Sequence, residues 1–115
     1  MTAKHFIINY CIYPFDLLVS IHESEQEVIK ILKKRLPDDV HKEIEDLPFS
    51  SEAFAVMFSS GQSFIRFLYK PTQGLIAHES LHAVAQLMNR IGNEDVNEAW
   101  NYLLQYIVTQ INNNL

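Results

Sequence analysis

The stretch QGLIAHESLHAVAQLMNRI, residues 73–91, contains no proline and repeats apolar residues at the spacing of an α-helix. Its apolar side chains follow one another at intervals of four and three residues, which predicts one continuous stripe along the helix. The stripe consists of Ala77, Leu81, Val84, Met88 and Ile91, widened by Ile76, Ala83 and Leu87. Gly92 comes directly after this stretch and is a typical C-terminal cap. We therefore expect a long helix with one face packed against a core.

Two histidines, His78 and His82, fall on a different face of this predicted helix. Residues four apart lie about 40° apart around the helix axis and roughly 6 Å apart along it, so both imidazoles can bind one metal ion. Glu79 lies about 100° further round the helix, where it cannot easily become a third ligand. It can still lean toward a water bound on the open side of the metal. The spacing predicts a metal site in which Glu79 acts as a general base.

Four segments are typical of β-strands because β-branched and aromatic side chains are concentrated in them. They are residues 5–13, 17–22, 53–58 and 63–69. Each consecutive pair is separated by a short turn, so we expect two hairpins. We expect Arg66 at an exposed position of the last strand, and Cys11 as a small core residue of the first.

Three further helices are expected around these strands and the histidine helix. Ser24 followed three residues later by Glu27 predicts a capped helix start. Residues 38–47 predict a short acidic helix, and residues 95–111 predict the last helix of the chain. The order ββααββαα indicates an α+β fold, with a four-stranded antiparallel or mixed sheet and helices on one face.

Length, charge and cysteine content restrict the class of protein. The chain has 115 residues, which favours a single domain over residues 1–115. Its net charge of −5 gives no support for nucleic-acid binding. No apolar run approaches the roughly 18 residues of a membrane span, and no signal peptide is evident. With one cysteine, we expect a cytoplasmic protein in a reducing compartment.

The histidine motif and the helix that follows it resemble a known class of enzymes. His-Glu-x-x-His at residues 78–82, with a later Asn97-Glu98, resembles the gluzincin branch of the zinc peptidases known as zincins. The pattern over residues 76–84 and 97–106 is also similar to small metallopeptidase-like proteins encoded by phages and prophages. The resemblance implies a zincin-like fold, in which the active-site helix is followed by a helix that carries a glutamate.

The resemblance also implies a role for individual residues. His78, His82 and Glu98 would bind a zinc ion (Zn2+), and Glu79 would be the general base. Zinc would lower the pKa of its bound water to about 7 and polarise the scissile carbonyl. Glu79 would take a proton from this water and pass it to the leaving amine.

The donor that stabilises the oxyanion stays open among Tyr102, Tyr106 and His22. Tyr102 stands where many gluzincins have an aspartate that orients the first histidine. Asn101, Asp95 or a backbone carbonyl could replace that acceptor. His5, His22 and His41 are otherwise expected to be structural or surface residues.

The connection to the third ligand is short. Fifteen residues separate His82 from Glu98. A helix that ran unbroken to Ile91 would end about 14 Å beyond His82. The helices must then end early, cross steeply or use a rising loop if Glu98 is to reach the metal. Asp95 and Glu94 are the alternative ligands.

The leading hypothesis is a small zinc-dependent metallopeptidase or related amide hydrolase that acts on a peptide or protein substrate. An edge strand, formed by residues 53–58 or 63–69, would bind the substrate backbone by strand addition. The alternative is a catalytically inactive, phage-derived module of zincin fold with a binding or structural role. A third hypothesis is a metal-free structural domain.

Overall fold

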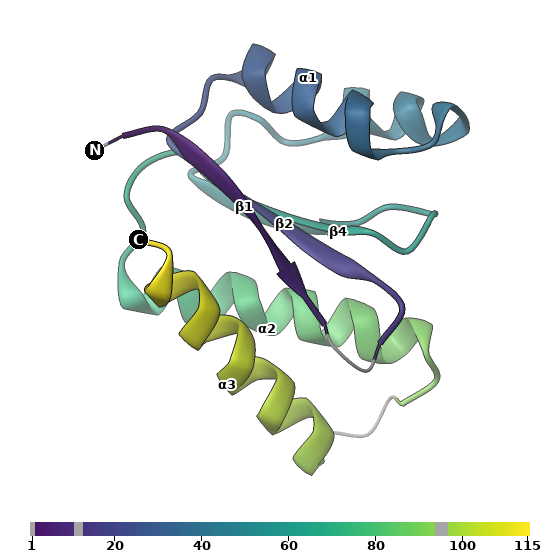
Figure 1. Cartoon of the computed structure of the whole chain (residues 1–115), viewed down its shortest axis with the longest axis vertical. Helices are drawn as coiled ribbons and strands as arrows, with labels where there is room; N and C mark the ends of the chain where they lie inside the picture. The colour runs from purple at the N-terminus through teal and green to yellow at the C-terminus, as the bar shows by residue number, and fades with distance from the viewer. Residues whose placement is uncertain (1, 11–12, 94–96) are drawn as a thin grey trace.

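The computed structural model describes residues 2–10, 13–93 and 97–115. A four-stranded sheet lies between two layers of helices (Figure 1). One layer contains α1 (Glu25–Arg35) and the 3-10 helix η1 (Asp38–Asp46), and the other contains α2 (Gln73–Arg90) and α3 (Glu98–Asn113). The α+β class and the element order are therefore confirmed. The predicted core residue Cys11 lies outside the described residues.

The sheet is mixed. Its strands are β1 (Lys4–Asn9), β2 (Asp16–Ile21), β3 (Ala53–Met57) and β4 (Ser63–Phe67), in the spatial order β1-β2-β4-β3. The pairs β1–β2 and β3–β4 are antiparallel, as expected for hairpins, whereas the central pair β2–β4 is parallel. This parallel pair places the two hairpins side by side in one sheet.

Helices cover both faces of the sheet, so the prediction of helices on one face is wrong. Leu18 and Phe64 pack in a core with α1 and η1. Their neighbours Val19 and Ile65 pack in a second core with α2 and α3. The physical reason is the parallel pair, because β2 and β4 occupy the middle of the sheet and bury side chains on both of its faces.

The helix ends follow the sequence closely. Ser24 accepts a hydrogen bond from the backbone N–H of Glu27 at 3.2 Å, which confirms the expected start of α1. The acidic segment is helical as predicted, but it forms η1, a 3-10 helix. Gly92 follows α2 with a φ of +83°, a conformation that favours glycine. No helix of the described residues is long and apolar enough to cross a membrane.

Arg66 is buried at 2% exposure, which makes the prediction of an exposed arginine wrong. Its guanidinium donates hydrogen bonds to the carbonyls of Phe49 at 2.9 Å and Glu23 at 3.0 Å, and it lies 5.4 Å from the centre of the Phe49 ring. Burial lowers its pKa from the ordinary value. A central strand covered on both faces has no solvent-facing side, so Arg66 instead ties two loops to the sheet.

We expect Arg66→Leu to lower the free energy of unfolding by about 2–4 kcal/mol, because it leaves two carbonyls without their charged donor. Urea denaturation of the purified protein measures the change. Arg90→Leu is the matched control, since Arg90 is exposed and stacks over the Phe15 ring. Equal stability of the Arg66 variant and the native chain would contradict the role assigned to Arg66.

Candidate metal site

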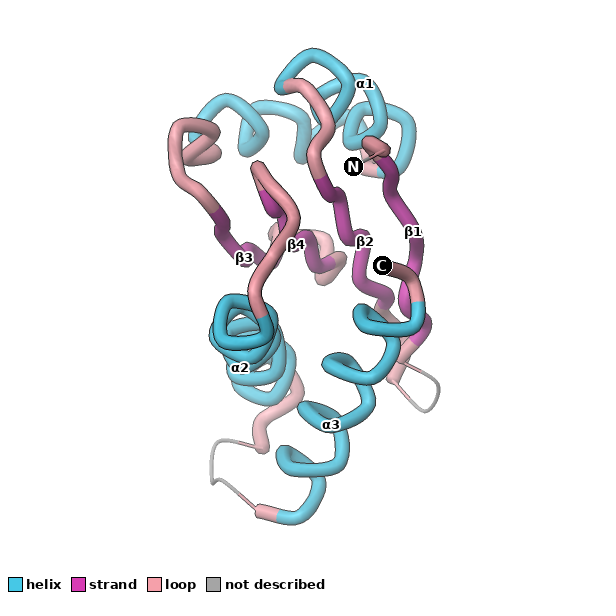
Figure 2. Tube along the Cα trace, turned by 90° about the vertical axis from the view of Figure 1, so that its left-hand side faces the viewer, coloured by secondary structure: helices cyan, strands magenta, loops and turns pink. Residues whose placement is uncertain are grey.

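Polar contacts fix α2 at both sides of the motif. The hydroxyl of Thr72 accepts a hydrogen bond from the N–H of Leu75 at 3.2 Å and caps the helix. Gln86 donates a side-chain hydrogen bond to the carbonyl of Ala55 on β3 at 3.0 Å. At the start of α2, the amides of Gln73 and Asn112 bond each other and join α2 to the end of α3. In Figure 2, α2 lies beneath β3 and β4, and α3 runs beside it beneath β2 and β1.

The buried face of α2 differs from the predicted stripe. Ala77 is exposed, as are Leu81 at 49% and Ile91 at 39%. The predicted stripe was rotated too far around the helix axis. It followed the longest series of apolar residues at intervals of four and three, and that series is not the face that packs against the sheet. The residues that pack inward are Ile76, Glu79, Ser80, Ala83, Val84, Leu87 and Met88. The prediction that His78 and His82 lie outside the packed face is confirmed, since both are exposed.

The two histidine rings face each other across one turn of α2. Their Nε2 atoms are 3.2 Å apart, and the ring centres are 4.8 Å apart with an angle of 80° between the ring planes. In the absence of a metal, this distance suits a hydrogen bond in which one Nε2–H donates to the other ring. The arrangement therefore brings together the two nitrogen atoms that a metal would need.

The same distance fits zinc. Two imidazole nitrogens that each lie about 2.0–2.1 Å from a tetrahedral zinc ion must be about 3.3 Å apart. The measured separation of the His78 and His82 Nε2 atoms is 3.2 Å. A single ion could thus bind both rings without a change in the backbone of α2.

Glu79 completes a group of three possible ligands. One carboxylate oxygen and one nitrogen from each histidine all lie within 4.8 Å of one another. Glu79 is only 4% exposed, and it faces β3, because Gln86 is two turns further along the same side of α2 and bonds Ala55. The sequence interpretation missed this burial. The burial of Glu79 could have been predicted from its spacing. Glu79 lies three residues after Ile76 and four before Ala83, and both of these residues are buried.

The structure does not bring Glu98 to the histidines. Asn93, just past the end of α2, accepts a hydrogen bond from the Asn97 side chain at 3.0 Å and one from the Trp100 indole at 2.8 Å. The start of α3 therefore lies at the far end of α2, and Arg90 is about 12 Å beyond His82 along the helix. The predicted third ligand is not part of the group, because α2 runs unbroken to Arg90. The alternative ligands Glu94 and Asp95 lie outside the described residues.

The candidate oxyanion donors are not placed at the histidine pair either. Tyr106 donates its hydroxyl to the carbonyl of Asn9 at the end of β1. Tyr102, one turn earlier on the same side of α3, is 67% exposed. His22 follows β2 in a left-handed conformation, with its ring 3.3 Å from the carbonyl of Leu68.

Comparisons of the chain with protein-family models, with curated proteins and with solved structures found no match in any of the three. The interpretation of the site therefore depends on the geometry of α2 alone. This geometry can hold a metal with two nitrogen ligands and one nearby carboxylate.

We expect the purified protein to bind about one zinc ion per chain, because the cluster provides one position between two imidazoles. His78→Ala and His82→Ala should each weaken zinc binding by a factor of ten or more, as measured by competition with a chromophoric chelator. His22→Asn is the matched control, since asparagine tolerates the left-handed backbone of His22. Unchanged zinc affinity in both α2 variants would contradict a site at this pair.

Glu98→Gln tests the third ligand directly. We expect its zinc affinity to equal that of the native chain within a factor of two, because Glu98 begins α3 away from the histidines. The same chelator competition measures this affinity. A tenfold loss would mean that α3 moves toward α2 when the metal binds.

Proposed function

We propose that the chain is a small zinc-dependent hydrolase of peptide or related amide bonds. The observation that carries this proposal is the 3.2 Å separation of the His78 and His82 Nε2 atoms, with the Glu79 carboxylate in the same group. The resemblance of residues 78–82 to the zincin motif gives the same chemistry, and the phage- or prophage-type origin that it implies is part of the proposal.

Each residue of the cluster would have a distinct role. Both imidazoles bind through Nε2 in their neutral form, so the remaining proton of each ring is on Nδ1. A bound zinc ion would supply a Lewis acid for the carbonyl under attack and acidify the attacking water. Glu79 accepts the proton of the attacking water and delivers it to the leaving amine. Its burial limits the motion of its carboxylate, which keeps the base close to the two imidazoles.

The sheet order supports a substrate position at β3. Of the two strands considered for the edge, β3 is outermost and β4 is interior. β3 is also the strand to which α2 is bonded through Gln86 and Ala55. An extended peptide added to the free edge of β3 would have its backbone held by main-chain hydrogen bonds beside the cluster.

A catalytically inactive metal-binding module is the second candidate. Catalytic zinc sites usually have three protein ligands and one open position. Within the described residues, the group contains only His78, His82 and Glu79. If Glu79 became the third ligand, its carboxylate would no longer be free to act as the base. The chain would then bind zinc without hydrolysing a substrate.

Glu79→Gln separates the two candidates. For a hydrolase, we expect the variant to keep its zinc and to lose hydrolysis of a fluorogenic peptide library by a factor of about 10²–10⁴, because the amide cannot accept the proton. Glu45→Gln is the control, since Glu45 is exposed on η1 in the opposite layer.

Other results of this experiment would contradict the hydrolase. Full activity of Glu79→Gln would exclude Glu79 as the base. Loss of zinc from the variant would identify Glu79 as a ligand. A native chain that holds zinc and cleaves no member of the library would support the inactive module.

A further inference from the structure

A groove of about 440 Å³ lies between β1 and α1, on the face of the sheet opposite α2. Ile7 pairs with Leu18 across the β1–β2 register, but α1 covers only Leu18. Leu18 is 3% exposed, whereas Ile7 is 43% exposed. Together with Ile31 of α1, these two residues give the groove an apolar floor and wall.

Two lysines and one glutamate, Glu27, line the groove, so it carries a net positive charge in a protein of net charge −5. Lys30 and Lys34 line it from α1, one turn apart on the same side of the helix. Neither lysine has an ion-pair partner among residues 2–10, 13–93 and 97–115. Arg35 is also at this end, but Asp16 neutralises it through two hydrogen bonds of 2.9 and 2.8 Å. Two free ammonium groups therefore remain available to an anion.

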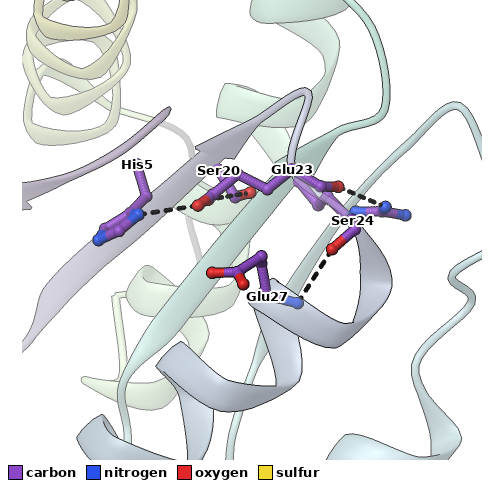
Figure 3. Close-up of polar contacts among 6 residues, drawn as sticks. His5, Ser20, Glu23, Ser24 and Glu27 are labelled. Carbon is purple, nitrogen blue, oxygen red and sulfur yellow. Dashed lines mark hydrogen bonds and ion pairs between the residues drawn. The ribbon is translucent and has the colours of Figure 1, made fainter. Parts of the chain in front are cut away.

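His5 lines the other end of the groove, and hydrogen bonds hold its ring in place (Figure 3). Its Nδ1 is 3.0 Å from the carboxylate of Glu23, which also accepts a hydrogen bond of 2.7 Å from the hydroxyl of Ser20. Glu23 is 8% exposed, and its carbonyl is held by Arg66. The second ring nitrogen of His5 points away from Glu23 (Figure 3). It is therefore free for a ligand, while the orientation of the ring is fixed.

We infer that this groove binds a linear aliphatic carboxylate. The carboxylate lies at the ammonium groups of Lys30 and Lys34, and the hydrocarbon chain covers Ile7, Leu18 and Ile31. The lining of the groove runs along α1 from Glu27 to Arg35, about 12 Å at 1.5 Å per residue, which suits a medium-chain acid such as decanoate. The site is independent of the histidine cluster on α2.

The position of the groove favours such a ligand over a peptide. A peptide recognised by strand addition needs the free edge of β1, where main-chain groups are unpaired. The groove instead lies over the face of β1, where side chains project toward α1. Apart from Glu27 at the His5 end, the partners available there are apolar side chains and ammonium groups, which match a chain with one anionic end.

Titration of the ¹⁵N-labelled protein with decanoate tests the inference. We expect saturable chemical-shift changes at the amides of Ile7, Ile31 and Lys34. The double variant Lys30→Glu/Lys34→Glu should weaken binding by a factor of ten or more. Lys33→Glu is the matched control, because Lys33 lies on the same helix beside Lys30 and Lys34 but does not line the proposed groove. Its affinity should stay within a factor of two of the native value.

Four results would overturn the inference. One is the absence of saturable shifts in the groove. Another is equal binding of decanol, which would remove the role of the carboxylate. The third is an equal loss in the Lys33 variant. The fourth is binding to phosphatidylglycerol vesicles without binding to free decanoate. Either result would indicate a general attraction of α1 for anionic surfaces.

Discussion

The parallel pairing of β2 and β4 is the constraint on which the rest of the structure depends. Parallel neighbours cannot be joined by a tight turn, so the chain must cross between them. That crossing contains α1, η1 and β3, and it places helices on the face opposite α2 and α3. The central strands are consequently buried on both sides. The buried Arg66 follows from the same constraint, because a central strand offers a polar side chain no route to solvent.

The candidate metal site is a consequence of how α2 packs beneath this sheet. One face of the helix is occupied by the core, and Gln86 fixes its rotation against β3. The opposite face is left to His78 and His82, whose Nε2 atoms are 3.2 Å apart. Glu79 lies at the boundary between these two faces, with its stem buried and its carboxylate near both rings. The sheet thus sets the rotation of the helix, and the rotation sets which side chains form the group.

Local features could be predicted from the sequence because they depend on neighbours in the chain. The two hairpins, the Ser24 cap and the pairing of His78 with His82 are of this kind. Features that depend on the direction of a long connection could not be predicted from the sequence in this way. The parallel register of β2 and β4 had only one signal, the unbroken apolar run Leu17-Leu18-Val19, which is typical of a strand buried on both faces. The end of α2 was predicted from Gly92, but the position of Glu98 also depends on the loop and the crossing of the two helices, which helical periodicity does not determine.

The central claim is that one metal ion is held between the Nε2 atoms of His78 and His82. Long-range ¹H–¹⁵N spectra of the histidine side chains during a zinc titration test this claim most directly. The account predicts that the Nε2 signals of both residues shift together and that the shift is complete at one equivalent of zinc. The signals of His5, His22 and His41 should not shift. A change at only one of the two rings, or an equal change at the other histidines, would contradict it.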